Sequence, residues 1–216
     1  MAWLSKVARS SVGKKQIVAL TGLALCGFLV VHLAGNLLLF AGQEAFDGYV
    51  ETLTSNPLII PAEVILALLF LGHIALAIRV TWENRRARPG RYTVSATRGE
   101  RTVASSTMIA SGLVVLVFLV LHLIDFKVAY EEGTSLYQLV VSKFQGPFYV
   151  IWYVFAVCVL GLHVSHGVQS SFRSLGLMHA KYTPIVEALG TIFAVIVAVG
   201  YASLPLYAYF FIGAAS

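Results

Sequence analysis

The chain has 216 residues, of which 58% are hydrophobic and 12% charged, with a net charge of +5 and a mean hydropathy of +0.83. Soluble domains carry about twice this charged fraction, so a soluble fold that covers itself with polar side chains is excluded. The length suits one compact bundle over residues 1–216 and leaves no room for a second soluble domain. No nucleic-acid partner is expected, because the basic residues fall where a membrane topology would put them.

Five stretches are apolar over the roughly 20 residues that a helix needs to cross a bilayer. We therefore expect an all-α integral membrane protein, a bundle of five transmembrane helices. The predicted spans are residues 17–41, 58–82, 103–126, 148–172 and 184–212. The basic segment before the first span does not resemble a cleavable signal peptide, because the apolar run after it is too long. Pro205, late in the fifth span, is expected to bend its helix.

Lysine and arginine residues predict the orientation of these spans. With the N-terminus inside, the outer side carries only Lys127 and Lys143. The inner side carries thirteen, namely Lys6, Arg9, Lys14, Lys15, Arg79, Arg85, Arg86, Arg88, Arg91, Arg98, Arg101, Arg173 and Lys181. This positive-inside bias places the N-terminus inside and the C-terminus outside. Residues 42–56 are then an acidic outer loop.

The first and third spans share a short motif. Gly22 is followed ten residues later by His32, and Gly112 is followed at the same spacing by His122. Ten residues of helix rise about 15 Å, so each helix has a histidine near the outer side and a glycine one level further in. Each glycine either lets a flat, bulky group such as haem approach closely or makes a small-residue contact between helices.

Ionisable groups inside a membrane are costly and usually functional. Five histidines lie in the predicted spans: His32, His73, His122, His163 and His166. His32 lies about 14 Å from the outer end of its helix, and His122 lies about as close. His73 lies about 22 Å from the outer end of its helix, and His163 about as far.

Neutral imidazoles on facing helices of a bundle can supply both axial ligands of a haem. We therefore expect an outer haem between His32 and His122. A second, inner haem is expected between His73 and His163. His166 lies one turn from His163 on nearly the same face, and it is the alternative ligand on that helix.

Arg79 and Arg173 lie at the inner ends of the second and fourth spans. Both are expected to anchor their helices at the inner membrane surface, and both could also bind haem propionates through charge-assisted hydrogen bonds. His179, in the loop before the fifth span, is expected to be a surface or subunit-contact residue.

The chain resembles the cytochrome b membrane subunit of diheme succinate dehydrogenases and fumarate reductases over essentially its whole length. The matching segments are TGLALCGFLVVHLAGN, LGHIALAIR, SGLVVLVFLVLHL and LHVSHGVQSSFRSLG. In that family one histidine on each of the first four helices ligates haem, which implies the same two pairs here. The family's fourth-helix ligand precedes one glycine by four residues and another by thirteen. Gly167 and Gly176 satisfy both spacings for His163 and neither for His166.

The resemblance implies the anchor and electron-transfer subunit of a succinate:quinone oxidoreductase. A flavoprotein and an iron–sulfur subunit would bind the inner face, where the basic segment 85–101 is expected to dock them. Electrons would pass from succinate through two b haems to a quinone in the lipid, with menaquinone expected in preference to ubiquinone. The chain has no flavin fingerprint and no cluster-binding cysteine set, so it has no succinate chemistry of its own. The expected location is the bacterial cytoplasmic membrane.

Three polar residues near the outer haem are candidates for binding quinone: Asn36, Glu63 and Asp125. Each has a structural alternative. Asn36 could hydrogen-bond within its own helix, Glu63 could stabilise a helix N-terminus, and Asp125 could end a helix at the membrane interface. Some diheme members have a glutamate beside the fourth-helix ligand, whereas Gly161 occupies the matching place here. A proton path through carboxylates of that helix is therefore not expected.

Two other functions are compatible with histidines in a membrane. The cytochrome b of another quinone-linked respiratory oxidoreductase, or a ferric reductase, often has two ligands on one helix, whereas each well-placed histidine here has its own helix. A transporter or assembly protein that uses histidines for protons or metal would favour broken helices and inverted repeats, and neither is evident in the sequence.

Overall fold

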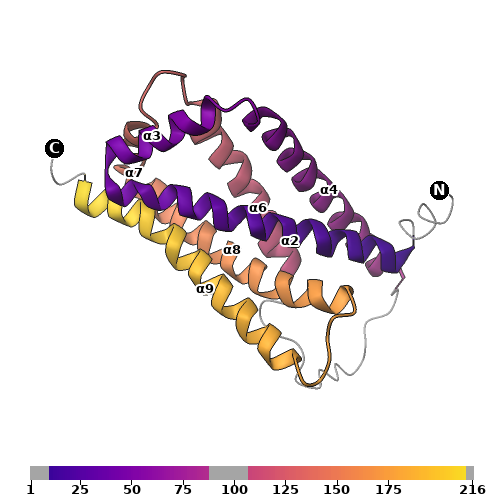
Figure 1. Cartoon of the computed structure of the whole chain (residues 1–216). Helices are drawn as coiled ribbons and strands as arrows, with labels where there is room; N and C mark the ends of the chain where they lie inside the picture. The colour runs from indigo at the N-terminus through magenta and orange to yellow at the C-terminus, as the bar shows by residue number, and fades with distance from the viewer. Residues whose placement is uncertain (1–9, 88–106, 213–216) are drawn as a thin grey trace.

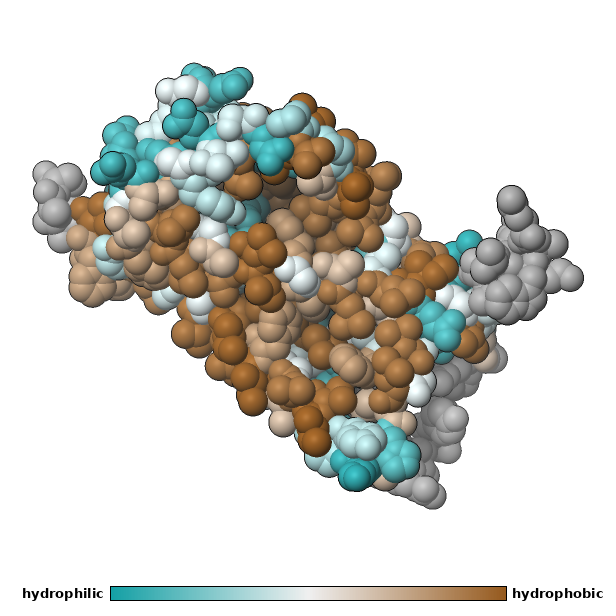
Figure 2. Space-filling model, viewed as in Figure 1, coloured by the Kyte–Doolittle hydropathy of each residue, from teal (hydrophilic) through white to brown (hydrophobic). Residues whose placement is uncertain are grey.

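The structure is a computed structural model, and it describes residues 10–87 and 107–212 of the chain. These residues form helices and no strands, and five helices are long and apolar enough to span a membrane (Figure 1). The predicted all-α chain with five such helices is therefore confirmed. The spans are Ser11–Ala41, Ile59–Arg86, Met108–Val128, Pro147–Ser174 and Thr183–Ile212. Figure 2 shows a hydrophobic surface over the long helices and hydrophilic residues gathered toward the ends, the pattern that a bilayer requires.

Each span contains one long helix, and three spans end in a short turn of different pitch. The first is α2 (Ser11–Asn36) with the 3-10 helix η1 (Leu37–Ala41), and the second is α4 (Ile59–Arg86). The third is α6 (Met108–His122) with the π-helix η2 (Leu123–Val128). The fourth is α8 (Pro147–Ser174), and the fifth is α9 (Thr183–Tyr207) with the π-helix η3 (Ala208–Ile212).

The first span begins at Ser11 rather than at residue 17, because a local cap starts it earlier. The Ser10 hydroxyl accepts a hydrogen bond from the Gly13 N–H at 3.0 Å, which satisfies one of the free amide groups at the helix start. The extra turns include Lys14, which is buried and pairs with Glu83 of α4. This ion pair ties α2 to α4.

Several of the predictions fall partly outside the described residues or are not tested by them. Residues 103–106, which should open the third span, lie outside, as do residues 1–9 and most of the basic segment 85–101. Pro205 lies within α9, which continues past it, so the bend expected there stays a prediction.

Two short helices absent from the sequence-based predictions lie at one end of the bundle (Figure 1). They are α3 (Gln43–Thr54), in the predicted outer loop, and α7 (Leu136–Phe144). Asp47 of α3 accepts hydrogen bonds from the Ser135 hydroxyl at 2.6 Å and the Tyr137 N–H at 2.9 Å, which fixes α7 to α3. This end is called the capped end. The opposite end, which carries Lys14, Arg79 and Arg173, is called the basic end.

The long helices pack around α8, which contacts α2, α6 and α9. Helix α4 packs mainly on α2, and none of its residues is buried. Helix α6 packs mainly on α8, so α4 and α6 flank the bundle without extensive contact between them. The four helices that carry the predicted ligands thus form two packed pairs joined through α2 and α8.

Gly161 explains the tight packing of α8 on α9. It is buried, and a Cβ atom added to it would lie 2.9 Å from the Ala198 Cβ and 3.2 Å from the Ala194 carbonyl oxygen. No side chain fits there without separating the two helices. Gly161 is therefore a helix contact in this chain.

Candidate functional site

The two levels of histidines are related by one internal repeat. His122 follows His32, and His163 follows His73, by 90 residues in each case. The same offset relates Thr21 to Ser111, and it relates Gly22 to Gly112 and Phe28 to Phe118. The α2–α4 pair of helices and the α6–α8 pair therefore present equivalent residues at equivalent positions.

At the level nearer the basic end, each histidine is held by a hydroxyl group of the neighbouring helix. His73 Nδ1 lies 3.1 Å from Thr21 Oγ1, and His163 Nδ1 lies 3.2 Å from Ser111 Oγ. The partners are 52 residues apart in both cases.

These hydroxyl groups also decide the tautomer of each imidazole. The Thr21 hydroxyl donates to the Ile17 carbonyl at 2.8 Å, and the Ser111 hydroxyl donates to the Met108 carbonyl at 3.0 Å. A hydroxyl has one proton to donate, so its oxygen must accept the Nδ1–H of the imidazole. Nε2 then carries the free electron pair, which is the form in which a neutral histidine binds a metal.

The two glycines of the repeat lie beside these imidazoles. A Cβ atom on Gly22 would lie 3.1 Å from His73 Cε1, and one on Gly112 would lie 3.3 Å from His163 Cε1. Both glycines therefore give room to a histidine ring of the adjacent helix. Direct clearance for haem at these glycines stays a prediction.

At the level nearer the capped end, His32 and His122 face each other with ring centres 5.9 Å apart and ring planes at 86°. An imidazole nitrogen binds a first-row metal at about 2 Å and lies about 1 Å from its ring centre, so two axial imidazoles on one metal stand about 6 Å apart. The observed spacing fits that arrangement. His122 Nδ1 is buried and has no hydrogen-bond partner among the described residues.

Aromatic rings surround this capped-end pair. Phe28 stacks on His32 with ring centres 5.1 Å apart, and Phe118 lies 5.6 Å from His122. Tyr201 lies 5.9 Å from His32. Flat apolar walls of this kind suit a large planar cofactor, so the residues present fit a haem at this level.

The other residues predicted for the basic-end haem, His166, Arg79 and Arg173, lack the hydroxyl–imidazole arrangement of His73 and His163. His166 is half-buried. Arg79 is largely exposed, and its Nε donates to Glu83 at 3.0 Å. Roles for Arg79 and Arg173 toward haem propionates stay predictions, whereas His163 is the α8 histidine that has a hydroxyl partner equivalent to that of His73.

The three quinone candidates lie at the capped end in different settings. Asn36 Nδ2 donates to the His32 carbonyl at 2.7 Å and lies 3.4 Å from His32 Nδ1. Glu63 is partly exposed and pairs with Lys127 of η2 at 2.5 Å. Asp125 is buried and accepts hydrogen bonds from other helices.

The Asp125 carboxylate is the centre of a small polar network. It accepts from the Lys143 ammonium at 2.9 Å and from the Tyr153 hydroxyl at 2.9 Å. Its hydrogen bond raises the pKa of Lys143 above the ordinary value, so this lysine stays charged at neutral pH. The Tyr153 ring lies 6.2 Å from His122, which links the network to the capped-end histidines.

Tyr153 and Tyr201 were not among the residues predicted from the sequence. Aromatic residues are common in membrane spans, so composition alone does not mark them. Spacing could have found Tyr153, because it precedes His163 by the same ten residues that separate Gly22 from His32. That spacing places Tyr153 one level away from His163, beside His122.

The fold and the histidines define a class of multi-pass membrane protein that carries an imidazole on each of four spanning helices, with His32 and His122 in ring contact. Residues 81–202 match the family described as succinate dehydrogenase/fumarate reductase transmembrane subunit, and the chain belongs to this family. The match includes His122 and His163, while His32 and His73 precede it. Comparisons with curated proteins and with solved structures gave no match.

Family membership defines the setting in which the chain works. It is a membrane subunit of a succinate dehydrogenase or fumarate reductase complex, and it associates with other subunits of that complex. Succinate itself is not converted by this subunit.

Proposed function

We propose that this chain is the membrane anchor of a succinate:quinone oxidoreductase and carries electrons between an iron–sulfur subunit and a membrane quinone through two b haems. His32 and His122 would ligate one haem near the capped end. His73 and His163 would ligate the other near the basic end. The observation that carries the proposal is that His32 and His122 lie ring to ring on α2 and α6, while His73 and His163 hold equivalent hydroxyl-bonded positions on α4 and α8.

Bound haem supplies a one-electron redox centre, and the chain supplies its position and surroundings. The Thr21 and Ser111 hydroxyl groups orient the imidazoles and increase their basicity as ligands. Gly22 lies beside the His73 ring and therefore has the same depth in the bundle. His32 follows Gly22 by ten residues of α2, so the two levels are about 15 Å apart. Two centres at that separation would form an electron path across much of the bilayer.

The basic end would face the cytoplasm, with the N-terminus inside and the C-terminus outside, in a bacterial inner membrane. Its arginines and the segment 85–101 would dock the iron–sulfur and flavoprotein subunits. The quinone, with menaquinone preferred over ubiquinone, would react near the capped end. The charge distribution supports this orientation.

The visible spectrum and haem content of the purified complex test the proposal. We expect low-spin b-type spectra and two haems for each copy of this chain. A folded, colourless complex would contradict the proposal. The family match favours this function over that of a ferric reductase or transporter, and co-purification with a flavoprotein and an iron–sulfur subunit tests that preference.

Removing the hydroxyl partners should weaken the basic-end haem selectively. We expect Thr21→Val and Ser111→Ala each to reduce the affinity of one haem by roughly 10- to 100-fold, because the imidazole loses the group that orients it. Haem titration and a potentiometric titration of both centres measure this. Thr191→Val is the matched control, since the Thr191 hydroxyl donates within α9, to the Glu187 carbonyl. Equal changes in both haems would contradict the assignment of these hydroxyls to one level.

A further inference from the structure

A pocket of about 310 Å³ lies at the capped end between the α6–η2 segment and α8. Its lining residues are Leu121, Asp125, Phe148, Tyr149 and Trp152. Leu121 directly precedes His122, and Asp125 follows it by three residues, so the pocket borders the capped-end histidine level. Its volume is at the lower end of the range for small-molecule sites.

The pocket is accessible from the apolar surface of the bundle. Phe148 is 75% exposed and Leu121 is 41% exposed, and both belong to membrane-spanning segments. A hydrophobic molecule dissolved in the bilayer could therefore enter sideways, without crossing water. An isoprenoid tail could remain in the lipid while a ring occupies the pocket.

Two of the lining residues, Trp152 and Asp125, carry polar groups. Trp152 Nε1 is buried and lacks a hydrogen-bond partner within the part of the chain that the structure describes. Buried donors are almost always paired, so this indole N–H calls for an acceptor. The Asp125 side chain is 11% exposed, and it connects through Lys143, whose side chain is 27% exposed, to the surface at the capped end.

We propose that this pocket binds the quinone head group. The Trp152 indole N–H donates a hydrogen bond to a quinone carbonyl, and Asp125 gives protons to the quinone or takes them from the quinol. This inference rests on the proposed function and deepens it. Reduction of one quinone to quinol takes two electrons, which haems held by the histidines of the two levels would supply one at a time. It also takes two protons, which Asp125 passes from the surface beside Lys143. Quinol oxidation is the reverse of the same steps.

The pocket near Glu63 at the capped end has fewer groups that could bind a quinone. A second pocket of about 190 Å³ lies at the start of α4, lined by Leu53, Asn56, Leu58, Ile59 and Ala62. None of these lining residues is titratable. The nearby carboxylate of Glu63 is already paired with Lys127. The pocket beside α8 is larger and combines an unpaired donor with a carboxylate.

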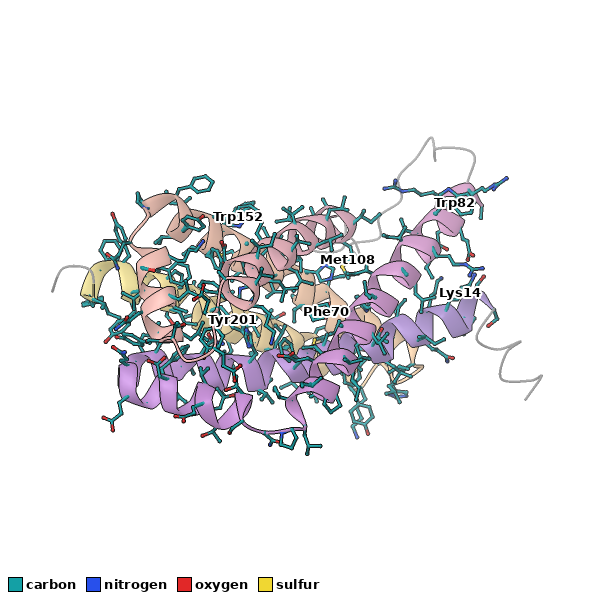
Figure 3. The ribbon with its side chains drawn as sticks, turned by 90° about the horizontal axis from the view of Figure 1, so that it is seen from above. Lys14, Phe70, Trp82, Met108, Trp152 and Tyr201 are labelled. Atoms are coloured by element: carbon teal, nitrogen blue, oxygen red, sulfur yellow. The ribbon has the colours of Figure 1, made fainter. Side chains whose placement is uncertain are left out.

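The test uses the complete complex and a naphthoquinone with a short isoprenoid tail as the probe. Trp152→Phe keeps the ring and removes the N–H, and it should raise the KM for the probe about three- to tenfold with little change in kcat. Asp125→Asn should lower kcat about 100-fold and change its pH profile, because a proton carrier is lost. Trp82→Phe is the matched control, since Trp82 lies on α4 at the basic end (Figure 3).

Haem reduction by succinate without quinone is recorded for every variant. Its absence in the wild type would mean that the proposed function fails, whatever the pocket does. If haem reduction is normal and Trp152→Phe and Asp125→Asn both react with the probe like the wild type, the pocket assignment is overturned. It is also overturned if Glu63→Gln, rather than Trp152→Phe, raises the KM.

Photolabelling of the wild type by an azido-naphthoquinone avoids variants altogether. It should label residues 121–125 or 148–152, and labelling confined to residues 53–63 would refute the assignment.

Discussion

His163→Ala should lower the haem content of the complex from two to one for each copy of this chain, whereas His166→Ala should leave it at two. The reason is the hydrogen bond of His163 to Ser111, which repeats that of His73 to Thr21 and leaves Nε2 free. His166 lies one turn away on the same helix and is half-buried. Haem-to-protein ratios from the pyridine haemochrome spectrum measure the effect.

Double variants test the pairing itself. A His73→Ala and His163→Ala double variant should retain one haem, because both residues would serve the same centre. A His32→Ala and His163→Ala double variant should retain none, because each substitution would remove a ligand from a different centre. His179→Ala is the control for an exposed histidine. One haem in the second double variant, or loss of haem in His166→Ala, would show that the ligand pairs are wrongly assigned.

Gly161→Ala should destabilise the bundle by about 1–3 kcal/mol, because overpacking a close contact forces backbones apart. The added methyl group would meet the Ala194 carbonyl oxygen and the Ala198 Cβ of α9, neither of which can rotate away. Thermal unfolding of the complex in detergent, followed by circular dichroism and by the haem spectrum, measures the loss.

Gly27→Ala is the matched control for this substitution. Nothing lies within 4 Å of a Cβ atom at Gly27 in α2, so the alanine costs no contact and favours the helix. We expect unchanged or slightly increased stability for Gly27→Ala. Equal unfolding temperatures for the two variants would show that the contact between α8 and α9 at Gly161 is not tight.

Hydrophobic length and positional spacing were enough to predict the spans and the depth of each histidine. A span is a local property, because about 20 apolar residues must be consecutive to cross the bilayer. Depth along a helix follows from residue count at a fixed rise. The second, fourth and fifth spans and the end of the third were therefore predicted to within a few residues of the observed helices. The first span was predicted late because the Ser10 cap lies in a polar, basic segment.

Tertiary structure alone decided what each side chain touches. The hydroxyl–imidazole bonds of Thr21 and Ser111 join residues 52 positions apart, so they depend on how two helices rotate and pack. The same holds for the placement of α7: Ser135 caps its start locally, but the contact with Asp47 of α3 decides where it lies. The chain by itself thus determined five spans and two levels of histidines. Packing between helices decided that the repeat glycines make room for imidazoles and that Asp125 faces Tyr153 and Lys143, since cross-helix neighbours follow from side-chain fit and leave no periodic signal.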